Sequence, residues 1–290
     1  MNRERFGLVF LGDFGQTFKR PLFWVLLIIL GLTAFGLAGG NVRIASGDAN
    51  VGGTKAWLTS EFAQSQMLSM VIFIFYMFFI AVGAGMSLIR DDEQKVGEVL
   101  HATNLTPGEY VWGKFWAVVL GFVAILGLHL VLTVFFNQVF PTANADEIRG
   151  PFGLMNYLRP GLVFGLPTIL FFAGTTYAVG GLTRKPILVF VVPVIAIIST
   201  FFMWDWSPGW LDPRINRVMM LVEPSGFRWL NETWLKVDQG VEYYNSAPVG
   251  YDAGFLVSRL ALVAVGLLAV LFTERRFAAT LRGSRAAGKV

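Results

Sequence analysis

Six long apolar stretches constrain the fold of this chain more than any other feature. An α-helix rises about 1.5 Å per residue, so about 20 apolar residues are needed to cross the roughly 30 Å hydrocarbon core of a bilayer. With 55% hydrophobic and only 14% charged residues, the chain is also too apolar for a soluble domain of 290 residues. The sequence therefore predicts an all-α membrane protein with six transmembrane helices, at residues 21–40, 67–89, 115–140, 161–182, 186–204 and 255–272.

The distribution of Lys and Arg residues predicts the orientation of these helices. With six spans both termini lie on one side, and that side carries more Lys and Arg than the opposite side, although its loops are shorter. Positive residues gather on the cytoplasmic side of membrane proteins. We therefore expect a multi-pass protein of the cell (inner) membrane with both termini in the cytoplasm. The net charge of +4 is explained by attraction to anionic lipid headgroups, and no nucleic acid partner is needed.

The segment before the first span, residues 1–20, has the pattern of an amphipathic helix. One apolar residue type recurs every fourth position, at Phe6, Phe10, Phe14 and Phe18. Charged and polar residues, Asp13 among them, point elsewhere, which favours an elbow helix that lies in the membrane interface until Pro21 turns the chain into the bilayer. The alternative is a cytosolic extension of the first span.

A polar interruption, residues 90–114, separates the second and third spans. Asp91 is placed to cap a short helix with an apolar stripe at Val96, Val99 and Leu100 and charged residues on its other side. A second helix start follows, in which Thr106 caps, Pro107 takes the first helical position and Glu109 completes a capping box. The third span is therefore expected to begin in the cytoplasm.

Two further polar regions flank the last span. The segment 205–254 is too polar to span, yet Phe227, Leu230 and Trp234 share one helical face, which predicts a short helix at the outer interface or dipping into it. It is an exit vestibule or a lid over the spans. The tail, 274–290, is rich in Arg in a small-residue context and is expected to lie against the inner leaflet.

The sequence contains no recognisable catalytic or ligand-binding pattern. The chain has no cysteine, and its two histidines, His101 and His129, are too separated to bind a metal. Gly108 to Lys114 has the spacing of a phosphate-binding loop, but Phe115 replaces the Ser or Thr that would hold magnesium, and no strand precedes it. We therefore assign no catalytic, cofactor-binding or metal-binding residue.

The predicted spans also lack a group for ion coupling. Carriers driven by protons or sodium place a carboxylate within the membrane, and no Asp or Glu falls inside the six spans. Arg259 is the one formal charge in a span, and its long side chain is expected to snorkel to the outer interface. If the chain moves a substrate, the energy is therefore expected to come from a partner that binds the cytoplasmic loops.

With these features, the sequence resembles the ABC-2 type permeases, the six-span membrane subunits of ATP-binding cassette exporters. The resemblance is carried by the elbow, by the loop from Arg90 to Leu100 that leads through Thr106-Pro107 to Gly113-Lys114, and by the long connection before span six. It implies an elbow at 1–20 and a single transmembrane domain at 21–290, with a coupling loop at 90–114, an extracytoplasmic segment at 205–254 and a basic cytoplasmic tail at 274–290.

The resemblance also implies a function. The chain is then a non-catalytic permease subunit that forms an export route with a second permease, identical or different, and a partner ATPase binds the ATP and magnesium. The implied contacts with that ATPase are Asp92, Glu93, Val96, Glu98, Val99 and Leu100, with Arg184 and Lys185 as a smaller second contact. A plain solvated loop is the alternative for these residues. The alternative function is a membrane scaffold that anchors a peptidase or assembly factor through the outer segment, and an intramembrane enzyme is disfavoured for want of residues.

Overall fold

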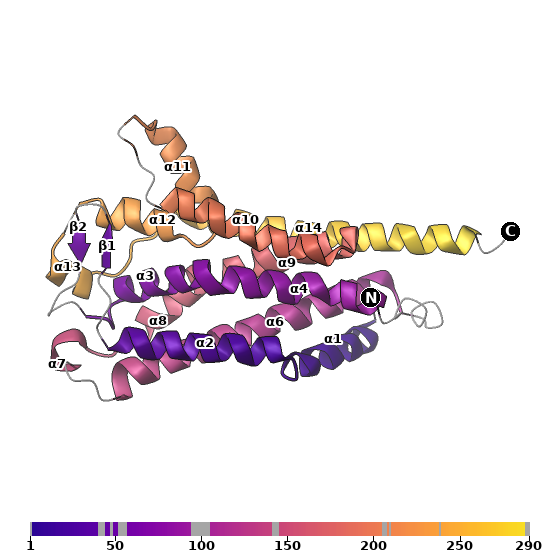
Figure 1. Ribbon diagram of the computed structural model, residues 1–290, viewed down its shortest axis with the longest axis horizontal. Coiled ribbons are helices and arrows are strands. Elements are labelled where there is room, and N and C mark those ends of the chain that lie inside the picture. The colour runs from indigo at the N-terminus through magenta and orange to yellow at the C-terminus, as the bar shows by residue number, and fades with distance from the viewer. Residues whose placement is uncertain are drawn as a thin grey trace.

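The computed structural model describes most of the chain as long helices that lie side by side along the long axis of the molecule (Figure 1). The described residues are 2–39, 44–46, 49–51, 57–93, 105–140, 145–204, 208, 210–237 and 239–287. Their α-helices are α1 Arg3–Thr17, α2 Pro21–Ala38, α3 Glu61–Val71, α4 Met77–Glu93, α6 Pro107–Val134, α7 Ala145–Ile148, α8 Met155–Pro160, α9 Leu166–Thr183, α10 Pro186–Trp204, α11 Pro213–Val222, α12 Phe227–Leu230, α13 Val241–Ser246 and α14 Ala253–Ala287.

Four π-helical turns widen these helices. They are η1 Ile72–Tyr76, η2 Phe135–Val139, η3 Gly161–Gly165 and η4 Asn231–Leu235. Pro160 ends α8 directly before η3. Because proline has no N–H to donate to the preceding turn, the widened turn is a natural continuation of the helix at this point. Two short strands, β1 Ile44–Ser46 and β2 Ala49–Val51, pair antiparallel with Ile44 opposite Val51, a small departure from the predicted all-α fold.

Five helices of the described chain are long and apolar enough to cross a membrane. They are Pro21–Ala38, Glu61–Asp91, Pro107–Val139, Met155–Thr183 and Ala253–Thr280, and each contains or overlaps one predicted span. The predicted sixth span, 186–204, corresponds to α10, a shorter apolar helix over Pro186–Phe201. Pro21 and Pro186 each begin their helices, because the fixed φ of proline suits the first helical turn.

Glycines bring three of these helices into direct backbone contact. Gly174 of α9 faces the backbone of Gly266 in α14, and Gly180 faces the backbone of Gly85 in α4, with no room for a Cβ atom at either position. Helices in a membrane associate by close packing of small residues, because lipid tails are as apolar as the side chains. The helices α4, α9 and α14 therefore form the tightest part of the bundle.

The part of the segment between α10 and α14 that includes α12 packs as protein core. The predicted short helix exists as α12 and η4, and Phe227 and Leu230 are buried against the protein. Its position relative to the outer interface stays a prediction. Gly226 begins α12 with φ +76°, and a Cβ atom there would collide with the Phe164 ring. In Figure 1, α11 projects from this end of the bundle, and α14 continues past the opposite end.

The expectation that Arg259 snorkels to the outer interface is wrong. Its side chain is only 3% exposed and donates hydrogen bonds to the carbonyls of Leu221, Glu223 and Pro224, the shortest being 2.6 Å to Pro224. These carbonyls lie at and just after the C-terminal end of α11, where helix geometry leaves them without internal partners. Arg259 therefore ties the α11–α12 turn to the first turns of α14.

Candidate coupling site

One end of the bundle, which we call the coupling end, brings together the described parts of the predicted coupling loop. The last turn of α4 and the first turn of α6 lie there, at the right-hand end of Figure 1, together with α1 and the turn between α9 and α10. Gly85 and Leu88 of α4 contact Gly180 and Gly181 of α9 in the same order along the chain. The two helices therefore run parallel and end at the same side of the molecule.

The start of α6 is fixed by the predicted capping box. Thr106 Oγ1 accepts from the Glu109 N–H at 3.3 Å, and Glu109 Oε2 accepts from the Thr106 N–H at 3.0 Å. The second oxygen of Glu109 accepts from the Asn2 N–H at 2.5 Å. One carboxylate therefore caps α6 and also holds the residue that precedes α1.

A buried charge cluster joins α1, α4 and α6 directly behind this cap. Lys114 Nζ lies 2.8 Å from Asp13 Oδ2 and 2.6 Å from Asp91 Oδ2, and the Tyr110 hydroxyl donates to the same oxygen of Asp91. Lys114 is 5% exposed. The residue pattern did not predict this cluster, and it placed Asp13 on the polar side of the elbow. The signal that was available is the lysine within the first turns of a long apolar helix, where a charge needs partners.

Two small contacts hold neighbouring helices against the first turns of α6. A Cβ atom on Gly113 would lie 2.9 Å from Val9 Cγ1, so the absence of a side chain lets α1 approach. Trp112 Nε1 donates to Glu274 Oε2 of α14 at 2.7 Å. The beginning of α6 is therefore packed between α1 and the end of the last span.

The predicted aromatic stripe of α1 is present as a continuous stack. The rings of Phe6, Phe10, Phe14 and Phe18 follow one another with centroid distances of 6.2, 5.7 and 5.1 Å, and Phe18 contacts Phe23 of α2 at 4.9 Å. All four rings are half-buried, whereas Leu8 and Leu11 of the same helix are exposed. Val9, Asp13 and Thr17 form a further face that packs on α6. The position of this helix in a membrane interface stays a prediction.

The structure places part of the predicted ATPase contact. Glu93 is exposed at the last residue of α4, and Lys185 is exposed in the turn between α9 and α10. Arg184 is exposed too and ends α9 in the left-handed conformation, with φ 53°. Asp92 belongs to the last turn of α4, but its side chain lies outside the described set. The remaining predicted contacts also lie outside the described residues, namely Val96, Glu98, Val99 and Leu100.

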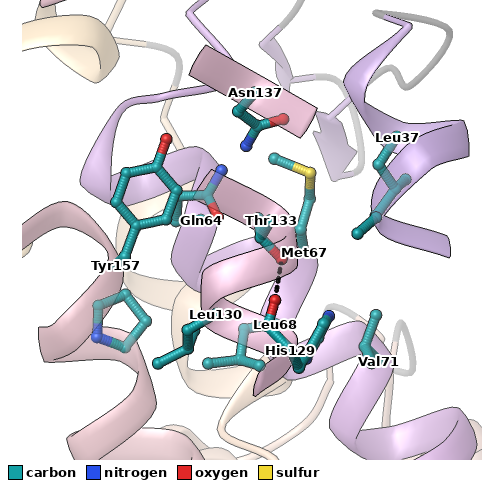
Figure 2. Close-up of a pocket in the computed structure, with 12 residues that line it drawn as sticks. Leu37, Gln64, Met67, Leu68, Val71, His129, Leu130, Thr133, Asn137 and Tyr157 are labelled. Atoms are coloured by element: carbon teal, nitrogen blue, oxygen red, sulfur yellow. Dashed lines mark hydrogen bonds between the residues drawn. The ribbon is translucent and has the colours of Figure 1, made fainter. Parts of the chain in front are cut away.

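A second polar region lies away from the coupling end, in a pocket between α2, α3, α6 and α8. Figure 2 shows Gln64, His129, Asn137 and Tyr157 among its apolar walls. His129 Nδ1 lies 3.3 Å from the Tyr76 hydroxyl, and the His129 carbonyl accepts from Thr133 at 2.8 Å. No group of three His, Asp or Glu suited to a metal occurs within the described residues, and His101 is outside them. The geometry of His129 is that of a hydrogen-bonded structural residue.

Comparison with known proteins assigns the family. No curated protein matches the chain. The model of a family described as "ABC-2 family transporter protein" matches residues 58–208, from the residues just before α3 to those just after α10. This match spans more than half of the 290 residues and includes the polar loop on which the resemblance was recognised. The chain is therefore a multi-pass membrane protein that belongs to the ABC-2 family of transporter proteins.

Proposed function

We propose that the chain is a permease subunit that a separate ATPase drives through the loop between α4 and α6. The observation that supports this most directly is the buried cluster of Lys114, Asp13 and Asp91 at the base of that loop. Asp91 stands in the last turn of α4, and Lys114 stands in the second turn of α6. The loop therefore begins and ends on two helices that are bonded to each other.

Such a link suits the transmission of force. A loop that is pushed by a partner moves the spans only if its two ends are attached to rigid elements with few alternative packings. Here the ion pairs, the Glu109 cap and the Trp112–Glu274 hydrogen bond attach the loop to α1, α6 and α14 together. A displacement of the loop would then reach three helices at once.

In this proposal the partner ATPase, and not this chain, binds ATP and magnesium. The stretch Gly108 to Lys114 has the spacing of a phosphate-binding loop, which would form a turn after a strand. In the structure it forms the first turns of helix α6. The Lys114 ammonium group is paired with two carboxylates, so it is not available to bind a phosphate. The chain would supply the membrane route, and the ATPase would supply the chemistry.

The remaining parts of the proposal concern assembly. We take α10 as the sixth span, residues 21–290 as one transmembrane domain, and the coupling end as cytoplasmic, because α1 and the arginine-rich end of α14 lie there. A second permease, identical or different, would complete the route. Exposed apolar side chains on α2, α10 and α14 face lipid or that second permease. We propose export as the direction.

The test is co-purification of an ATPase subunit with the tagged chain. The double variant E98R/L100D changes the charge and the apolar stripe of the loop, and we expect it to lose the ATPase. A matched control is E242K, which reverses an exposed carboxylate in the segment between α11 and α14. Retention of the ATPase by E98R/L100D at the wild-type ratio would contradict the proposal.

The alternative function, a membrane scaffold, has one observation in its favour. Ile215, Val218 and Val222 form an apolar stripe on the projecting helix α11, and each is more than half exposed. If this stripe recruits a peptidase or assembly factor, I215D/V218D should lose that partner and keep the ATPase. Loss of the ATPase alone, in E98R/L100D, supports the permease.

A further inference from the structure

A hollow lies at the coupling end where the joint between α1 and α2 meets α4 and α6. It encloses about 360 Å³ of space between atoms, part of it open to the surroundings. Two arginines reach it from different helices: Arg20, which precedes α2, and Arg90, near the end of α4.

These two arginines bring two positive charges to the hollow, and Asp91, Asp13 and Glu93 are near enough to Arg90 to offset part of that charge. The arginines are half-buried and near enough for their like charges to repel each other. Within the described residues neither forms an ion pair, and Arg90 Nε donates to the Met86 carbonyl at 3.2 Å. The nearby carboxylates of Asp13 and Asp91 are both bonded to Lys114. Guanidinium N–H groups therefore remain for an anion, and a bidentate fork suits phosphate in particular.

The start of α2 adds to the positive potential of the hollow. Arg20 is its N-cap residue and makes no side-chain cap, while Leu22 and Phe23 of its first turn line the hollow. Pro21 has no N–H and the Phe23 N–H donates to the Arg20 carbonyl at 3.1 Å, so the first turn contributes the Leu22 N–H and the positive end of the helix dipole. Phosphate groups commonly bind at such helix starts.

The rest of the hollow is apolar and suits a hydrocarbon chain. Leu22, Phe122 and Ile125 form its walls below the arginines. The neighbouring Trp24 is 52% exposed, and its Nε1 donates to the Phe18 carbonyl at 2.8 Å. Tryptophan with one polar and one apolar side is typical of the membrane–water interface. The hollow thus has a cationic mouth at headgroup level and an apolar interior.

We propose that this hollow binds an anionic phospholipid, with its phosphate between Arg20 and Arg90 and an acyl chain along Leu22, Phe122 and Ile125. This lipid would fix the joint between α1 and α2 to the end of α4, beside the charge cluster that anchors the coupling loop. The proposal does not depend on the ATPase partner. It goes beyond the permease function, because it names a ligand that the membrane itself supplies.

The test uses the full chain purified in mild detergent. Phosphatidylglycerol, phosphatidylcholine and inorganic phosphate are each titrated, with native mass spectrometry to count bound lipid and thermal unfolding to follow stabilisation. We expect phosphatidylglycerol to bind and to raise the unfolding temperature more than the other two. In R20Q/R90Q its affinity should fall about 30-fold, since each Lys or Arg near an anionic lipid contributes about 1 kcal/mol.

The matched control is K19Q/R275Q, which removes two exposed charges from the same end of the molecule but outside the hollow. It should keep the affinity of the wild type within about threefold. Three outcomes would overturn the proposal: equal binding of the two lipids, full phosphatidylglycerol affinity in R20Q/R90Q, or equal stabilisation by inorganic phosphate alone. If R20Q/R90Q does not fold, R20K/R90K keeps the charge and loses the forked geometry, and unchanged affinity there also overturns the proposal.

Discussion

Lys114 is a charged residue within a long apolar helix, and both of its ion-pair partners belong to other helices. Asp13 and Asp91 lie far from it in sequence, yet their carboxylate oxygens are 2.8 and 2.6 Å from its ammonium. Three charged groups in one buried site compensate one another. Removal of one partner lowers the stability of the fold, because it leaves an uncompensated buried charge. At the scale of single residues, this cluster is the most sensitive point of the coupling end.

We predict that K114M destabilises the protein by up to about 3–5 kcal/mol, because it leaves two carboxylates that are only 15% exposed without their cation. Denaturant unfolding in detergent measures this change. The control K19M alters an exposed lysine near the same end and should shift stability by less than about 0.5 kcal/mol. The triple variant D13N/D91N/K114M, which removes all three charges, should recover much of the loss. Wild-type stability of K114M would show that the cluster does not form.

Asp252 gives a pH-dependent prediction at the opposite end. Burial alone would raise its pKa, but hydrogen bonds from Arg217 and Trp229, a third from the Phe255 N–H, and the Arg217 charge hold that pKa below its usual value. A carboxyl group with a lowered pKa contributes stability above its unfolded pKa of about 3.9, and this contribution is lost as the pH falls below that value.

The stability difference between wild type and D252N should therefore stay constant from pH 8 to about pH 4 and shrink at lower pH. Thermal unfolding of both proteins across this range measures it. A difference that already shrinks between pH 7 and pH 5 would contradict the assignment.

At the scale of helices, local signals in the sequence predicted more than any other source. The Thr106 cap, the prolines at Pro21 and Pro186 and the lengths of the apolar stretches each depend on neighbouring residues, and the structure has helices that begin at these points. The misjudged residues depend on distant partners. Arg259 was interpreted from its depth in the last span, but its acceptors come from the end of α11.

The same reason explains the missed part of the candidate site. The pairing of Asp13 with Lys114 joins helices about a hundred residues apart, and one sequence without a fold gives no distance between them. The charge pattern of the elbow suggested a solvated face for Asp13, because an isolated amphipathic helix has only two sides. In the structure α1 has a further side, which packs on α6.

The contact between α9 and α4 leads to a prediction about helix packing. G180A places a methyl group against the backbone of Gly85, and overpacking of this kind costs typically about 1–3 kcal/mol. G127A is the matched control, because a Cβ atom at Gly127 meets no atom within 4 Å and alanine favours the helix. Unfolding in detergent should show G180A destabilised and G127A unchanged or slightly stabilised. Equal stability of the two variants would exclude the close approach of α4 and α9.

At the scale of the whole molecule, the proposed orientation predicts which segments face the outside. The chain contains no cysteine, so a single introduced thiol is a unique label. An impermeant maleimide added to intact cells should label E242C and not E98C, and both should react after the membrane is opened. Labelling of E98C in intact cells would place the coupling loop outside and contradict the permease mechanism.

The glycine contacts of α9 also limit how the bundle can change shape. Where backbone meets backbone, as at Gly85–Gly180 and Gly174–Gly266, no side chain is available to change rotamer and absorb a sliding motion. The helices α4, α9 and α14 should therefore move together as one rigid body during a transport cycle. Opening and closing would have to take place along its border with α2, where side chains separate the helices and shear is possible.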